Sequence, residues 1–79
     1  MIDRKLIPVN DEYAIAIVTE RMSDGKWAVV ASIKHESPTG EQTIDLPVRD
    51  EHYADQQAAE EAGLGQAREW LAQNVAHAA

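Results

Sequence analysis

The side chains that could do chemistry are few and widely separated in this sequence. The chain has no cysteine, and its three histidines share no spacing typical of a metal site (His35, His52 and His77). Its serines fall in expected turns or on a strand, without the neighbouring base that a nucleophile needs (Ser23, Ser32 and Ser37). We therefore expect no catalytic residue, no metal and no cofactor, and a protein that is not an enzyme.

Acidic residues are numerous, but they are dispersed along the chain. The 14 Asp and Glu residues outweigh 7 Lys and Arg residues, which gives a net charge of -7. Acidic pairs such as Asp11-Glu12, Asp50-Glu51 and Glu60-Glu61 are typical of a solvated surface rather than of general acid–base catalysis. An acidic balance of this size disfavours nucleic acid and anionic membranes as partners.

Trp27 and Trp70 are the side chains best suited to stack on a base or a sugar. Each falls on the apolar face of the element predicted to contain it. We therefore interpret both as core residues.

The stretch 55–75 predicts the helix of the chain. At helical spacing its inward stripe consists of Ala59, Gly63, Ala67 and Trp70, flanked by Leu64, Leu71 and Val75. Asp55 is suited to cap the first turn, because its carboxylate can accept from the free amides there. Small residues at Ala59, Gly63 and Ala67 would let the helix backbone approach a sheet. Gly63 and Gly65 leave open a break into two shorter helices, since glycine disfavours a helix interior.

Three strands and two tight turns precede this helix. Residues 13–19 alternate strictly, residues 26–36 form a longer strand, and residues 42–48 form a third strand that Pro47 ends or confines to an edge. The turns are 23–25 and 37–40, and tight turns join antiparallel neighbours. We predict an α+β fold in which a three-stranded antiparallel meander carries one C-terminal helix on one face (β-β-β-α).

The chain is short enough to form one domain. Residues 1–12 have no clear period and are expected to form an N-terminal arm, in which Pro8 lacks the amide of a central strand. Residues 13–76 then make a single domain. The N-terminus lacks the long apolar run of a signal peptide, and no segment is apolar enough to span a bilayer. We expect a cytoplasmic protein with no membrane partner.

The two faces of the predicted sheet differ in character. The core is expected to contain Ile15, Ile17, Trp27, Val29, Ile33, Ile44, Leu46, Ala59, Gly63, Ala67, Trp70 and Leu71. The opposite face carries Ala14, Ala16, Val18, Ala28, Val30 and Ser32. A solvated face should carry Thr, Lys, Glu or Arg, so we expect this small, apolar face to be covered or to bind a partner. Either the arm with Leu6, Ile7 and Val9 folds across it, or a second copy packs against it.

Several of these segments resemble a known group of proteins. The segment DGKWAVVASIKHE, the Asp55 cap and the helix QQAAEEAGLGQAREWL resemble short proteobacterial proteins of unknown function whose helix ends in A-R-x-W-(I/L). The resemblance covers residues 13–71 and rests on Trp27, Ala59, Ala67, Arg68, Trp70 and Leu71. It implies the same β-β-β-α fold for a small bacterial protein, and it implies no activity or site residue. Gly63 and Gly65 depart from the group, in which alanine is commoner.

The order of elements is also similar to the C-terminal part of a double-stranded-RNA-binding domain. That family grips phosphates with lysines at the start of its last helix. This chain has Asp55-Gln56-Gln57 there, followed by Glu60-Glu61.

The sequence therefore favours an association module, with a protein partner or a second copy in a weak homodimer. The alternative is a nucleic-acid-binding module resembling a truncated double-stranded-RNA-binding domain, for which the 7 positive charges are a poor phosphate footprint.

Overall fold

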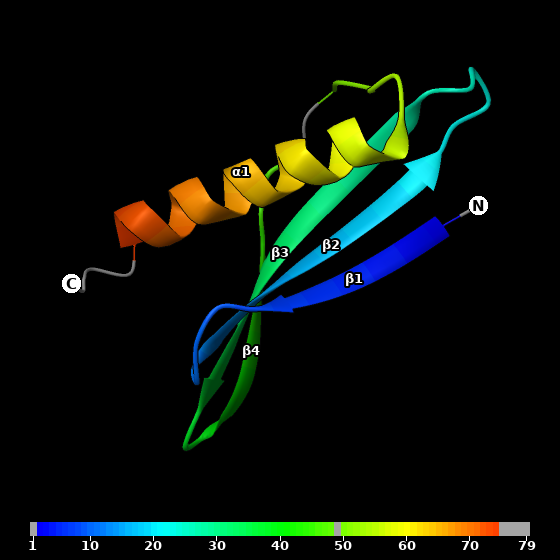
Figure 1. Ribbon diagram of the computed structural model, residues 1–79. Coiled ribbons are helices and arrows are strands. Elements are labelled where there is room, and N and C mark those ends of the chain that lie inside the picture. The colour runs from blue at the N-terminus through cyan, green and yellow to red at the C-terminus, as the bar shows by residue number, and fades with distance from the viewer. Residues whose placement is uncertain (1, 49, 75–79) are drawn as a thin grey trace.

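The computed structural model describes residues 2–48 and 50–74 (Figure 1). Its elements are β1 (Ile2–Pro8), β2 (Tyr13–Arg21), β3 (Trp27–Ser37), β4 (Gly40–Asp45) and α1 (Gln56–Asn74). The strands form a four-stranded antiparallel sheet in the order β1-β2-β3-β4. The predicted α+β meander with a C-terminal helix is confirmed, but the sheet has four strands rather than three.

The additional strand, β1, lies in the segment expected to be an irregular arm. It pairs with β2 along its whole length, with Ile7 opposite Ile15 and Asp3 opposite Thr19. A tight loop joins the two strands, in which Asn10 Oδ1 accepts from the amides of Glu12 at 2.8 Å and of Tyr13 at 2.9 Å. Because β1 is an edge strand, most of its side chains are exposed whether they are apolar or polar, so its sequence lacks the alternation of a half-buried strand. Pro8 ends the strand, where its missing amide is tolerated.

The central hairpin of β2 and β3 gives the sheet its core. Ile15 pairs with Ile33, and Ile17 pairs with Ala31. The turn between the strands lies where it was predicted, with Gly25 at a φ of 84° and the Lys26 amide donating to Asp24 Oδ1 at 2.9 Å. Gly40, at a φ of 135°, begins β4 after the second predicted turn.

The third predicted strand ends earlier than expected. β4 stops at Asp45, and Leu46 continues beside β3 through a hydrogen bond from its amide to the Ala31 carbonyl at 3.1 Å. Pro47 then interrupts the pairing, because it has no amide to donate. Val48, predicted to lie in the strand, is 67% exposed beyond it.

The helix is continuous through both glycines, so the alternative with a break there is wrong. Asp55 caps it as predicted, since its Oδ1 accepts from the Ala58 amide at 2.8 Å. Val75, the predicted end of the helix, lies outside the described residues. Within those residues, no helix is long and apolar enough to cross a membrane.

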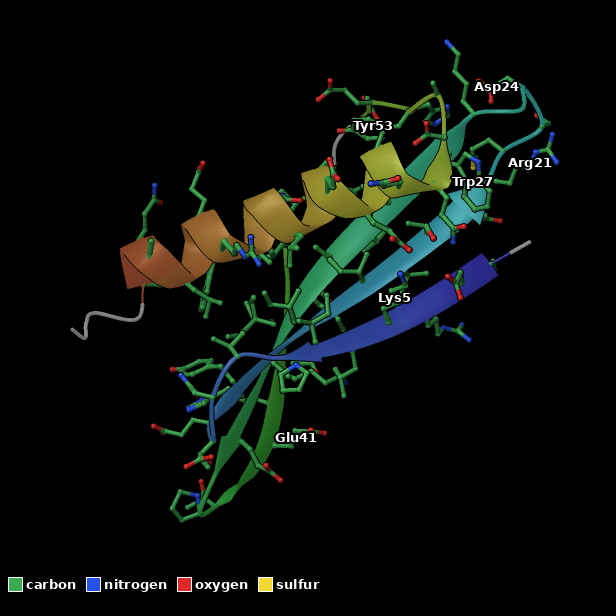
Figure 2. All side chains as sticks on the ribbon, in the orientation of Figure 1. Lys5, Arg21, Asp24, Trp27, Glu41 and Tyr53 are labelled. Carbon is green, nitrogen blue, oxygen red and sulfur yellow. The ribbon has the colours of Figure 1, made fainter. Side chains whose placement is uncertain are left out.

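α1 packs on β2 and β3 through its small residues. Ala59, Gly63 and Ala67 are buried, and the space above Gly63 is filled by the Val29 and Ile17 side chains. Figure 2 shows that α1 begins beside the end of the sheet that carries Arg21 and Trp27, and in Figure 1 the β3–β4 hairpin extends beyond the helix. The predicted core residues all lie on this side of the sheet or on the helix. Five of them are only half-buried (Trp27, Val29, Ile44, Trp70 and Leu71). Thr19 and Ala31 are buried in addition to the predicted residues.

Candidate interaction surface

The face of the sheet opposite α1, called the outer face below, is the candidate functional surface. Side chains alternate between the two faces of a strand, and Ile17 and Val29 point toward the helix. Their neighbours therefore point away from it. By the strand registers, the outer face carries Ala14, Ala16 and Val18 of β2 and Ala28, Val30 and Ser32 of β3, which are the six residues expected from the sequence.

The strand registers arrange the outer face in rows across the sheet. One row contains Arg4, Val18 and Val30, and the next contains Leu6, Ala16, Ser32 and Asp45. A third contains Pro8, Ala14, Lys34 and Thr43. The first two rows thus carry small or apolar side chains on β2 and β3, whereas the charged side chains are Arg4 and Asp45 on the edge strands and Lys34 in the third row.

β1 contributes apolar side chains that sequence reasoning did not assign to this face. Leu6 is 60% exposed and lies beside Ala16, and Ile2 is also exposed and lies beside Glu20. The Asn10-Asp11 pair could have indicated β1 from the sequence, because such a pair is typical of a turn and a turn before residue 13 implies a preceding strand. With β1 included, the apolar part of the outer face spans three strands.

Residues 2–48 and 50–74 place no element over the outer face. The helix packs on the other side, and the segment with Leu6 and Ile7 is an edge strand in the plane of the sheet. The alternative in which this segment folds across the face is therefore wrong, because the segment is hydrogen-bonded to β2 as a strand of the sheet. Val9 lies in the loop after β1 and is exposed.

The outer face is slightly hollow at its centre. A shallow depression of about 430 Å³ lies over Ala16 and Ser32, with Arg4 and Lys34 among its lining residues. The depression exists because alanine and serine fill little space between the longer Leu6 and Val18 side chains. A shape of this kind admits apolar side chains from a facing surface.

The charges on the outer face are unevenly placed. Arg4 lies on the β1 edge and Asp45 on the β4 edge, and the ion pairs of the described residues include neither. Lys34 lies between them and donates to Thr43 Oγ1 at 3.4 Å. At the far end, Glu36 lies directly opposite Glu41, and its amide donates to the carbonyl of Glu12, the residue before β2. Figure 2 shows Glu41 at this end of the molecule and Trp27 with Tyr53 at the other.

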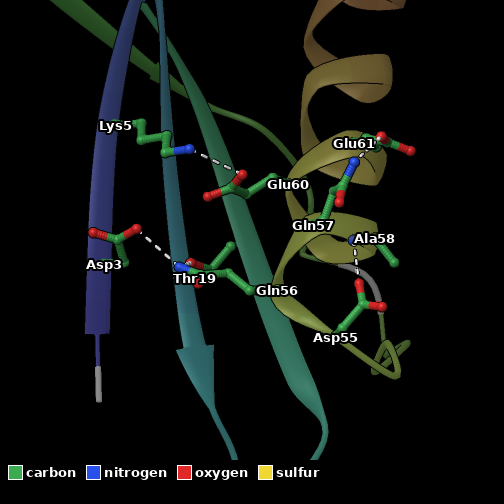
Figure 3. A network of polar contacts seen from close by, with 9 residues as sticks. All are labelled: Asp3, Lys5, Thr19, Asp55, Gln56, Gln57, Ala58, Glu60 and Glu61. Carbon is green, nitrogen blue, oxygen red and sulfur yellow. Dashed lines mark hydrogen bonds and ion pairs between the residues drawn. The ribbon is translucent and has the colours of Figure 1, made fainter.

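A second group of polar residues attaches β1 to the helix on the opposite side of the sheet (Figure 3). Gln56 Nε2 donates to Asp3 Oδ2 at 2.8 Å and to Thr19 Oγ1 at 3.2 Å. Lys5 Nζ forms an ion pair with Glu60 Oε1 at 3.1 Å. Thr19 is only 1% exposed, so the hydrogen bond from Gln56 satisfies a hydroxyl that would otherwise be costly to bury. We interpret this group as structural.

The histidines do not converge. His35 stacks on Tyr13 with the ring centroids 4.4 Å apart, and its Nε2 lies 3.7 Å from Glu12 Oε2. His52 Nδ1 lies 3.4 Å from Asp24 Oδ2, at the other end of the sheet. The Lys26 amide and, to a smaller extent, His52 lower the pKa of Asp24. Among the described residues no group of three or more His, Cys, Asp or Glu side chains is placed to hold a metal ion, and His77 lies outside them.

The three serines are dispersed as well. Ser23 lies in the β2–β3 turn, and Ser37 Oγ donates to the Gly40 carbonyl at 2.9 Å in the next turn. Ser32 belongs to the outer face. The histidines and serines of the described residues thus form no cluster, and the outer face remains the candidate functional surface.

No protein-family model, curated protein sequence or solved structure matches this chain.

Proposed function

We propose that this protein is a non-enzymatic self-association module in which two copies pair through their outer faces. The proposal is supported by one observation above all. The outer face is apolar at its centre, and the described residues leave it open to solvent.

A second copy suits this surface better than a segment of the same chain. Ala14, Ala16, Ala28 and Ser32 leave much of the face without long side chains, which lets another sheet approach closely. A two-fold contact between two such faces is self-complementary, because each copy presents the same shape to the other. The shallow depression over Ala16 and Ser32 would then admit apolar side chains of the opposite copy.

The expected dimer is weak. A single sheet face of a domain this small gives an interface at the low end of the size range of specific complexes. We therefore expect association in the high micromolar range, in a cytoplasmic setting.

Val30→Lys tests the proposal. Val30 is 40% exposed at the centre of the outer face, and a lysine there would bring two ammonium groups into the paired faces. The variant should keep the fold and should sediment as a monomer at concentrations where the unaltered protein forms dimers. The matched control is Val48→Lys, which makes the same change at a residue that is 67% exposed outside the strands.

Two results would contradict the proposal. One is an unaltered protein that sediments as a monomer throughout the high micromolar range. The other is a loss of association in Val48→Lys as large as in Val30→Lys, which would assign the effect to charge rather than to the outer face.

A further inference from the structure

A small pocket lies on the helix side of the sheet, between the C-terminal half of α1 and the segment that follows β4. Its volume is about 200 Å³. Gln66 Nε2 donates to the Pro47 carbonyl at 2.8 Å, which joins the two walls of the pocket. The pocket is therefore formed before a ligand binds, and this lowers the cost of binding. Its lining residues are Gln66, Glu69, Trp70 and Gln73 of the helix, with Leu46 and Pro47 on the opposite wall.

The four helix residues of the pocket share one face of α1. They occupy positions i, i+3, i+4 and i+7, which lie side by side on an α-helix. Trp70 is half-buried, since it packs against the core cluster and also lines the pocket. Its indole therefore has a structural role and also offers an aromatic surface to a ligand.

Hydrogen-bond acceptors outnumber donors in this pocket. The Glu69 carboxylate accepts and does not donate, and the Pro47 residue contributes only a carbonyl. Gln66 uses one of its two amide protons on that carbonyl. Among the described residues that line the pocket there is no Lys or Arg. A ligand that suits these groups is rich in donors and positively charged.

A guanidinium group meets these requirements better than an ammonium group or a sugar ring. It has five N–H donors and no acceptor, and its plane can stack on an indole, the aromatic group that binds cations best. An ammonium group has the charge but no plane to stack, and a sugar has no charge to pair with Glu69. The net charge of -7 also favours a cationic partner over a neutral one.

We infer that this pocket binds an arginine side chain of a basic partner protein, with the guanidinium against the Trp70 indole and one edge toward Glu69. The inference is independent of the proposed self-association, because the pocket and the outer face lie on opposite sides of the sheet. One side chain in an open pocket binds weakly, so we expect a dissociation constant on the order of millimolar for a single arginine. A peptide with several arginines should bind more tightly.

An NMR titration with a capped amino acid tests the inference. N-acetyl-arginine amide should shift the Trp70 indole and Gln73 side-chain amide signals in a saturable way. N-acetyl-citrulline amide has nearly the same shape but carries a neutral urea, and it should bind more weakly by roughly fivefold or more. N-acetyl-lysine amide, which keeps the charge and lacks the plane, should fall between the two.

Substitutions then assign the binding to the pocket. Glu69→Gln keeps the size of the side chain and removes its charge, and it should weaken binding of the arginine probe by roughly threefold. Glu61→Gln is the matched control, because it makes the same change at an exposed position of α1 outside this pocket, and it should leave the dissociation constant unchanged. Trp70→Phe should also weaken binding, with urea denaturation to establish that the variant is folded. Val30→Lys, on the outer face, should have no effect.

Four results would overturn the inference. One is equal affinity for the arginine and citrulline probes, and another is the lack of a saturable shift at Trp70 up to about 50 mM arginine probe. A loss in Glu61→Gln as large as in Glu69→Gln would assign the effect to overall charge. A methyl glucoside that shifts the same signals more strongly than the arginine probe would make the indole a platform for a sugar instead.

Discussion

At the scale of single residues, the two glycines of α1 show how much the same residue type can differ in role. A Cβ atom at Gly63 would lie 2.7 Å from Val29 Cγ2 and 3.2 Å from Ile17 Cδ1. A Cβ atom at Gly65 would meet nothing within 4 Å. Gly63 is therefore a point of close approach between helix and sheet, whereas Gly65 is an exposed position with no contact that requires glycine.

Alanine substitutions at these positions should have opposite effects on the free energy of unfolding. Gly63→Ala should destabilise the protein by about 1 kcal/mol or more, because the β-branched Val29 has little freedom to move aside. Gly65→Ala should stabilise it by about 0.5–1 kcal/mol, because alanine favours a helix and loses less backbone entropy on folding. Urea denaturation of the two variants measures both effects. A destabilising Gly65→Ala would contradict the continuous helix described above.

At the scale of elements, β1 depends on few attachments. It pairs with β2 on one side only, and Asp3 and Lys5 join it to α1 through Gln56 and Glu60. The Lys5–Glu60 pair is exposed and contributes little. Gln56 also donates to the buried Thr19, so we expect it to contribute more than the Lys5–Glu60 pair to the attachment of β1.

Gln56→Glu should loosen β1 and destabilise the protein by about 1–3 kcal/mol. A glutamate at this position loses the amide that donates to Asp3 and Thr19, and it places a second carboxylate beside Asp3. Hydrogen exchange should then become faster in the β1 amides paired with β2, while the β2–β3 amides change little. Gln56→Ala is the control, with a smaller loss because it adds no charge. Unchanged exchange in β1 would show that pairing with β2 alone holds the strand.

The elements also show where sequence reasoning succeeds. The alternation in β2 and β3 is clear because large residues on the helix side alternate with mostly small residues on the outer face, so the division into two faces follows from the pattern. β1 has only Asp3 and Ile7 half-buried, and a strand with so little burial leaves almost no periodic signal. The end of β4 was expected near Pro47. The pairing with β3 extends as far as Leu46, whose amide donates to the Ala31 carbonyl. The inward stripe of α1 was predicted because small residues recur at helical spacing.

At the scale of the whole molecule, the charges are distributed in a way that bears on nucleic acid. Asp55 caps α1 and Glu60 and Glu61 follow in its second turn, where Glu60 is paired with Lys5. Arg4 and Lys34 lie on the outer face, whereas Lys26 lies at the distant β2–β3 turn. Contacts with several phosphates along a duplex need a continuous basic surface, which this arrangement does not supply.

We expect no retardation of duplex RNA or DNA by micromolar protein at physiological salt. The net charge of -7 repels a polyanion, and the isolated cations cannot offset that repulsion. A gel-shift titration at two salt concentrations measures this. A salt-sensitive dissociation constant in the low micromolar range would contradict the expectation, and alanine substitutions of Arg4, Lys5, Lys26 and Lys34 would then locate the contact.

The strand order has a consequence for the way the chain folds. Each strand pairs with its neighbour in sequence, so all three pairings are hairpins with short connections, and the loop-closure cost of each is small. α1 has few large apolar side chains and two glycines, so it has little tendency to persist alone in water. The β2–β3 hairpin can therefore form first, and the docking of Gly63 against Val29 completes the fold. Until then both faces of the nascent sheet are accessible, and a newly made chain can meet another copy before its own core has closed.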